Sequence, residues 1–221
     1  MKKFDWASFF SNILAVVLGI FITFGIQGLI DRRSERKDVR SALELVREEL
    51  VDNKEALTEV MGLVGMEKEA AEYIIDNMDD FAKCDTNVLF QMNAILGNEY
   101  FMTVTDDALE LLKSSSLFQK MNDKVLALAI IKAYDYLEAN SQAFNTHEKY
   151  KVSLYGDVNT DKAKKAALIH SGPDYLKIFY SSAEANYFLK AVVDMSEAPF
   201  LESGIPAIDS AISALEEKLG L

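Results

Sequence analysis

The two histidines are the first candidates for chemistry in this chain, because imidazole is both a metal ligand and a general base. His147 and His170 are accompanied by a single cysteine, Cys84. Neither histidine has a glutamate three residues before it, so the Glu-x-x-His pattern of di-iron helices is absent. Two histidines without cysteine partners also fall short of a zinc site. We therefore expect both histidines to have surface or capping roles, with no metal bound.

The segment DVNTD begins like a calcium-binding loop, with Asp157, Asn159 and Asp161 at alternating positions. Its sixth position is Lys162 instead of glycine, and its twelfth is Leu168 instead of glutamate. The geometry of a calcium loop is strictest at these two positions. We expect the segment to serve as a helix cap and turn.

The run KSSS, residues 113–116, places a lysine beside three serines and could suggest a Ser/Lys hydrolase. At the end of a helix, the same residues are more simply a C-terminal cap and turn. The sequence also lacks the Gly-x-Ser-x-Gly motif, the phosphate-binding loop and the dinucleotide fingerprint. We predict no catalytic residue, no cofactor and no enzymatic activity.

The charge is distributed unevenly. Residues 1–40 hold seven Lys or Arg and four acids, a net of +3, whereas the whole chain of 221 residues carries −12. The remaining residues therefore carry −15. A domain of that charge repels phosphate backbones, so nucleic acid is excluded as an expected partner.

A transmembrane helix is predicted over Phe9–Ile30, which contains 22 residues without a formal charge. As a helix this segment is about 33 Å long, which matches the hydrocarbon core of a bilayer. Trp6 precedes it and Arg32 follows it as interfacial anchors. No small-x-small cleavage site precedes the charged flank, so we predict an uncleaved membrane anchor.

Small or polar residues recur every four positions in this span. The stripe consists of Ser11, Ala15, Gly19, Thr23 and Gln27. In lipid, helices associate where small residues allow close approach and polar side chains find partners, which favours self-association or docking on another span. The alternative is that Gln27, within a turn of the interface, only reaches water.

Two arguments conflict on which side of the membrane the domain lies. Two Lys precede the span and five Lys or Arg follow it within residues 31–40, which favours a cytoplasmic domain. The start Met-Lys-Lys is instead usual for a segment that keeps its N-terminus inside.

A heptad seam follows the span, with 4-3-4-3 spacing. It consists of Val39, Leu43, Val46, Leu50, Asn53, Leu57, Val60 and Val64. One interpretation is a short parallel coiled coil with Asn53 setting its register. The other, which we favour, is one long helix packed inside the domain. No Pro or Gly occurs between Leu29 and Met61, so the helix should leave the membrane unbroken, whereas Gly62 and Gly65 should loosen it.

Helical periodicity dominates the remainder, which predicts an all-α fold: a transmembrane helix that continues into a helical bundle. We divide the chain into an anchor (1–31), a membrane-proximal helix or stalk (32–65) and a bundle (66–221). Within the bundle we expect a short helix capped by Thr86 or Asn87, a helix over residues 107–114 preceded by a Thr105 cap, and a long helix after an Asn122 cap. The apolar segment 125–131 of that long helix should form the central core. Helices over residues 161–170, from Pro173 to about Met195 and from Pro206 to about Leu219 complete the bundle.

Two stretches resemble an uncharacterised family of bacterial single-span membrane proteins: VVLGIFITFGIQGLIDRR (16–33) and DDALELLKSSSLFQKMNDKVLALAIIKAYDYLE (106–138). The family usually has glycine where Ser116 stands, and an Asn-Asn-Trp-Asn run near Gln27 that is missing here. It has no assigned activity, so the resemblance implies only location and topology: a single span in a bacterial inner (cytoplasmic) membrane. The long basic N-termini of its members imply a domain outside the cytoplasm, which gives the periplasmic side a slight preference.

These features favour an interaction or scaffold protein that assembles with itself, as a homo-oligomer, or with another membrane protein through its span and long helix. The alternative is a membrane-tethered sensor or effector whose helical domain binds a small ligand and signals to the span. Both have the lipid bilayer as a partner.

Overall fold

In the computed structural model the chain is all-helical, and the described residues contain no strand, which confirms the predicted all-α class. The structure describes residues 6–158, 164, 173–196 and 204–221; for residues 6–32, Ala82 and Pro173 it describes the backbone only. The helices are α1 (Trp6–Asn77), the 3-10 turn η1 (Phe81–Lys83), α2 (Thr86–Gly97), α3 (Asp107–Ser114), α4 (Leu117–Lys120), α5 (Lys124–Val158), α7 (Pro173–Phe179), α8 (Ala183–Ser196) and α9 (Ile205–Leu219).

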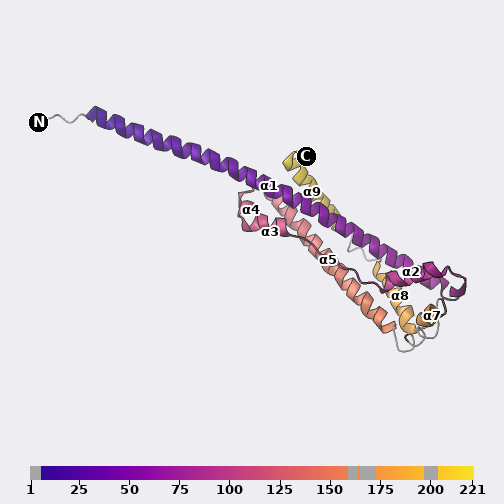
Figure 1. Ribbon diagram of the computed structural model, residues 1–221. Helices are drawn as coiled ribbons and strands as arrows, with labels where there is room; N and C mark the ends of the chain where they lie inside the picture. The colour runs from indigo at the N-terminus through magenta and orange to yellow at the C-terminus, as the bar shows by residue number, and fades with distance from the viewer. Residues whose placement is uncertain (1–5, 159–163, 165–172, 197–203) are drawn as a thin grey trace.

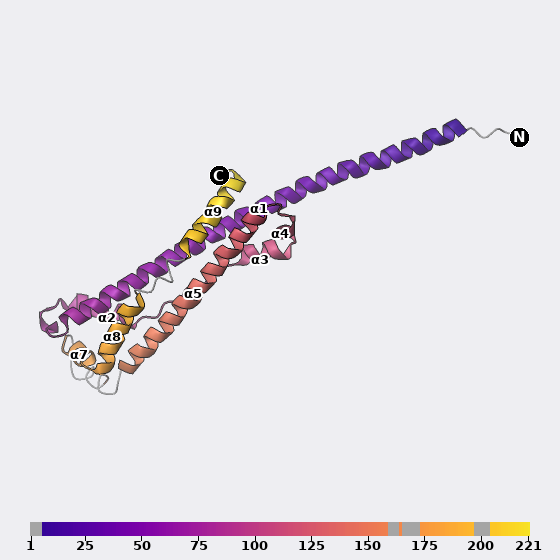
Figure 2. The same ribbon diagram turned by 180° about the vertical axis from the view of Figure 1, so that it is seen from behind.

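The chain runs along the bundle four times in alternating directions (Figures 1 and 2). Helix α1 leads away from the N-terminus, and α2, an extended connector, α3 and α4 return beside it. Helix α5 leads away again, and α8 and α9 return against both α1 and α5. The N-terminal part of α1 projects beyond the bundle, and the C-terminus lies at the end from which it projects.

Helix α1 is continuous over 72 residues. The loosening expected at Gly62 and Gly65 is wrong, because the helix passes through both without a break. The neighbouring Val60 and Val64 are buried in the core, and this packing outweighs the weak helix propensity of the two glycines.

The seam of α1 faces its own chain. Val39 is partly buried and the other seven seam residues are buried. All of them except Asn53 pack with side chains of α3, α5 and α9 in the first of two apolar cores. Residues 42–64 therefore belong to the bundle core. Basic side chains one heptad apart on α1 bind the antiparallel α9: Arg40 donates to the Leu219 carbonyl at 2.9 Å, Arg47 pairs with Glu216 at 2.7 Å, and Lys54 pairs with Asp209 at 2.5 Å.

The second apolar core fills the far end of the bundle, between α1, α2, α7 and α8. Its centre is aromatic: the Phe179 ring lies 4.9 Å from that of Tyr180 and 5.4 Å from that of Tyr155. The single helix predicted from Pro173 to Met195 is instead two, since α7 ends at Phe179 and α8 begins at Ala183. The break places Tyr180 in this core, where it is fully buried.

Several helix caps differ by one residue from those predicted. Asp85 caps α2 by accepting the amides of Asn87 and Val88, and Asp123 accepts the Leu126 amide at the start of α5. At α3, the Ala108 amide bonds to Glu49 of α1 at 3.0 Å. A carboxylate accepts amide hydrogen bonds at a helix N-terminus better than a neutral side chain does, which explains these choices.

The first turns of α5 are less central than predicted. Leu126, Ala127 and Ile130 are buried, but Val125 is 80% exposed and Leu128 is 59% exposed. The expectation that segment 125–131 is core on every side is therefore wrong. Helices α1 and α9 cover one face of α5 there and leave the other open.

No helix among the described residues is long and apolar enough to cross a membrane. The predicted span, residues 9–30, and its stripe of Ser11, Ala15, Gly19, Thr23 and Gln27 lie within α1, where the side chains fall outside the described set.

Candidate functional site

Residues 98–106, which we call the connector, are held to the bundle by side chains and not by helical hydrogen bonds. Asn53 of α1 accepts the Thr105 amide at 3.0 Å and donates to the Thr105 carbonyl at 2.7 Å. On α5, Asn145 accepts the Met102 amide at 2.9 Å, and both Asn145 and Ser141 donate to the Met102 carbonyl. The polar residue of the seam therefore satisfies backbone groups of its own chain.

A group of ionisable side chains, which we call the ionic cluster, lies where the connector crosses α1 and α5. It comprises Glu67, His147, Glu148 and Lys151, all buried. Lys151 Nζ donates to Glu67 Oε1 and, at 2.7 Å, to Glu148 Oε2. His147 Nε2 lies 3.2 Å from Glu67 Oε2, and Glu148 Oε2 also accepts the Tyr100 amide at 2.9 Å.

The pKa values of the two carboxyl groups in the ionic cluster are shifted in opposite directions. Burial alone raises the pKa of Glu67, but hydrogen bonds from His147 and Lys151 and the charge of Lys151 outweigh it and lower the pKa below its ordinary value. Burial is the largest effect on Glu148 and, together with the negative charge of Glu67, raises its pKa despite the hydrogen bonds from Lys151 and the Tyr100 amide and the charge of Lys151, which lower it. Glu148 is therefore the carboxyl group that holds a proton more readily.

The ionic cluster has donor atoms that could hold a metal ion. One atom each of Glu67, His147 and Glu148 lies within 4.8 Å of the others, and Glu148 Oε1 has no hydrogen-bond partner among the described atoms. The ammonium group of Lys151 nevertheless bonds to both carboxylates. A metal ion would bring a second cation beside this ammonium in a buried site, so the residues fit an internal ion pair better than a metal centre.

The surface or capping role expected for His147 is wrong, because its side chain is buried and bonded to Glu67. A signal for the ionic cluster is present in the sequence. Glu67 continues the α1 seam three residues after Val64, and Glu148 and Lys151 continue the buried stripe of α5 after Phe144. Charged residues at core-facing positions of a helix are buried only when they are paired, so these positions predict that each charged side chain has a partner.

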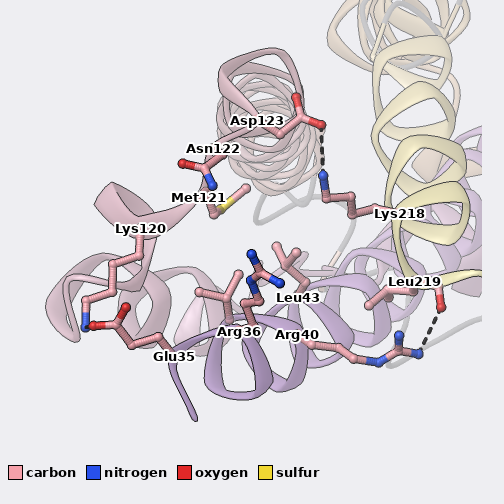
Figure 3. A pocket seen from close by; sticks show the side chains of 11 residues that line it. Glu35, Arg36, Arg40, Leu43, Lys120, Met121, Asn122, Asp123, Lys218 and Leu219 are labelled. Carbon is pink, nitrogen blue, oxygen red and sulfur yellow. Dashed lines mark hydrogen bonds and ion pairs between the residues drawn. The ribbon is translucent and has the colours of Figure 1, made fainter. Parts of the chain in front are cut away.

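A second candidate site is a cavity of about 730 Å³, which we call the end cavity, between α1, the turn from α4 to α5, and the end of α9 (Figure 3). It lies at the end of the bundle from which α1 projects. Its lining comprises Glu35, Arg36, Val39, Arg40, Leu43, Lys120, Met121, Asn122, Asp123, Lys218 and Leu219.

The end cavity is basic, with four cationic and two anionic side chains, although the chain as a whole is acidic. Lys120 pairs with Glu35 at 3.0 Å, and Lys218 pairs with Asp123 at 3.4 Å. Arg36 has no ion pair or hydrogen bond to any side chain or backbone group that the structure describes, and Figure 3 shows its guanidinium group pointing into the cavity. This arrangement suits an anionic ligand.

The other predicted features lie apart from both sites or outside the described residues. Lys113 and Ser114 end α3, and Ser115 and Ser116 form the expected cap and turn, in which Ser115 Oγ donates to the Leu111 carbonyl at 2.6 Å. His170 and the loop positions Asn159 and Asp161 fall outside the residues that the structure describes.

No family model, curated protein or solved structure matches this chain.

Proposed function

We propose that the protein is a membrane-anchored helical interaction protein, with residues 9–30 as a single transmembrane helix. The observation that carries the proposal is the continuity of α1, which runs without interruption from this apolar segment into both cores of the bundle. A continuous helix transmits position and rotation better than a flexible linker. The bundle is thereby held at a fixed distance from the bilayer.

Assembly is proposed to occur through the stripe of the span. The α1 seam is covered by the chain's own helices, so a coiled coil through the seam would require the bundle to open. The stripe from Ser11 to Gln27 offers small residues at four-residue spacing, which is the pattern that lets membrane helices approach closely. The partner is a second copy or another membrane protein.

The test is the mass of the full-length complex extracted with native lipid. Gly19→Leu and Gln27→Leu should each reduce it to a single chain of 24.7 kDa, because a bulky side chain separates the helices and loss of the amide removes a polar contact. Val17→Leu, which adds volume away from the stripe, is the matched control and should leave the mass unchanged. A complex that survives both stripe variants would contradict assembly through the span.

A second candidate function is that of a membrane-tethered sensor or effector. The end cavity favours it, because Arg36, Val39, Arg40 and Leu43 of α1 line the cavity and belong to the same helix as the proposed span. A ligand bound there would touch the helix that enters the membrane. The resemblance to bacterial single-span proteins favours a periplasmic bundle in either case.

A further inference from the structure

The end cavity lies close to the proposed membrane surface. Arg36 follows Ile30 by six residues in one unbroken helix, which corresponds to about 9 Å along its axis. The headgroup layer on each side of a bilayer is roughly 5 to 8 Å thick. If residues 9–30 span the hydrocarbon core, the Arg36 side chain lies at the outer edge of the headgroups.

The cations of the end cavity are engaged, with one exception. Lys120, Lys218 and Arg40 have partners within the chain: Glu35, Asp123 and the Leu219 carbonyl. Arg36 has none among the described groups, and its guanidinium points into the cavity (Figure 3). A guanidinium group binds phosphate oxygens through two parallel hydrogen bonds, whereas a lysine ammonium group acts as a single point charge.

Apolar side chains surround this charge. Val39, Leu43, Met121 and Leu219 line the cavity beside Arg36. Val125 and Leu221 follow cavity residues by two positions, and at 80% and 73% exposure they are the most exposed large apolar side chains among the described residues. Apolar surface next to an unpaired cation suits an amphiphile better than a free inorganic anion.

We propose that the end cavity binds the phosphate of an anionic phospholipid headgroup, with Arg36 as its principal ligand. The lining farther along α1 encloses the outer part of the headgroup, and the acyl chains extend from the phosphate back toward the bilayer, beside the exposed Val125 and Leu221. The inference rests on the proposed membrane anchor and adds a lipid class to it. A bound lipid would fix the end of the bundle against the membrane.

The test uses the full chain in nonionic-detergent micelles, titrated with short-chain phosphatidylglycerol, phosphatidylcholine or inorganic phosphate, with bound ligand measured by native mass spectrometry. Phosphatidylglycerol should bind at least about tenfold more tightly than either alternative, because the basic cavity repels the choline cation of phosphatidylcholine and inorganic phosphate makes no apolar contact. Arg36→Gln should weaken its binding about tenfold or more. Val39→Phe should weaken it as well, because the ring fills the cavity without changing the charge.

Lys37→Gln is the matched control, because it removes one charge from the next residue on α1, which does not line the cavity. It should change the affinity by less than about twofold. Equal losses in Arg36→Gln and Lys37→Gln would indicate diffuse charge attraction and overturn the site. Equal affinity for phosphatidylcholine, or for inorganic phosphate, would overturn the lipid assignment.

Anchorage is measured separately, by resistance of the full chain to alkaline carbonate extraction from membranes. A chain that resists extraction but shows no Arg36-dependent lipid preference would refute the end cavity and leave the anchor standing. A chain that is extracted, yet binds phosphatidylglycerol through Arg36, would refute the anchor and leave the headgroup site standing.

Discussion

Ser116 has a φ of 60°, in the left-handed region, and it is the one non-glycine residue with positive φ among those that the structure describes. It separates α3 from α4, where the chain turns before entering α5. A side chain with a Cβ is strained in this conformation, whereas glycine is not.

Ser116→Gly should therefore stabilise the chain by about 0.5–1 kcal/mol, the relief of strain being partly offset by the greater freedom of glycine in the unfolded state. Ser115→Gly is the control, because Ser115 has an ordinary φ of −78° and its hydroxyl bonds to the Leu111 carbonyl. That variant should destabilise the chain by roughly 1 kcal/mol. Thermal unfolding of the full chain in matched micelles measures both, and a destabilised Ser116→Gly would contradict the strain.

At the scale of elements, the connector shows how a segment without regular structure is stabilised. Its backbone groups are paired by polar side chains that project from α1 and α5: Asn53 at one end, and Ser141, Asn145 and Glu148 further along. Buried backbone groups must find partners, and here the neighbouring helices provide them. Asn53 thus fixes the position of the connector and the start of α3 that follows it.

Asn53→Leu should destabilise the chain by about 1–3 kcal/mol, because the amide and carbonyl of Thr105 both lose a partner. Hydrogen exchange at the Thr105 amide should accelerate more than exchange in the core of α5. Asn53→Asp retains an acceptor for that amide and should have a smaller effect on it. Thr58→Ala is the control on the same helix, since the Thr58 hydroxyl bonds only to Lys54 of its own helix. Unchanged exchange at Thr105 in Asn53→Leu would contradict this role.

At the scale of the whole molecule, α1 and α5 pass through two apolar cores, and the ionic cluster lies between them. The first core ends near Val64 on α1 and Phe144 on α5. The second core begins at Ala70 on α1 and includes Val158 at the end of α5. Glu67 and Lys151 link the two long helices at this boundary. The bundle thus contains a layer of charge whose protonation changes with pH.

The sign of that pH dependence follows from the two carboxylates. Glu148 has a raised pKa in the folded chain, so its contribution to stability is full below the ordinary glutamate value and is lost as pH rises through the raised pKa. Glu67 has a lowered pKa, so its contribution is present above the ordinary value and is lost as pH falls through the lowered pKa. The stability contributed by these two groups should therefore peak near the ordinary glutamate pKa. It should fall as pH drops toward the lowered pKa of Glu67 and as pH rises toward the raised pKa of Glu148.

Glu148→Gln should remove the part of the decline that lies on the alkaline side, because the amide stays neutral. We expect it to be more stable than the natural chain by roughly 1 kcal/mol in mildly alkaline solution. Glu59→Gln, with the same charge change at an exposed position of α1, should leave the slope unchanged. Chemical denaturation of the full chain across the pH range measures both, and parallel profiles for Glu148→Gln and the natural chain would refute the argument.

The sequence by itself determined the features that depend on short-range periodicity and turn chemistry. The all-α class, the bounds of α3 and, to within one residue, the start of α9 at Pro206 follow from local spacing and helix-start signals. The unbroken passage from the apolar segment through residue 61 also follows, since no Pro or Gly interrupts it. These features are local because helical hydrogen bonds join residues four apart.

Only the tertiary structure decided which polar residues meet. Glu67 and Lys151 lie 84 positions apart, and Arg36 and Lys218 line one cavity from opposite ends of the chain. Their periodic phase predicts that Glu67 and Lys151 face inward, but the choice of partner depends on how α1, α5 and α9 are packed. Burying an unpaired ion costs far more free energy than burying a paired one, so the packing decides which charged groups are stable inside the bundle. The packing also leaves Arg36 without a partner among the described groups, and so available for the proposed ligand.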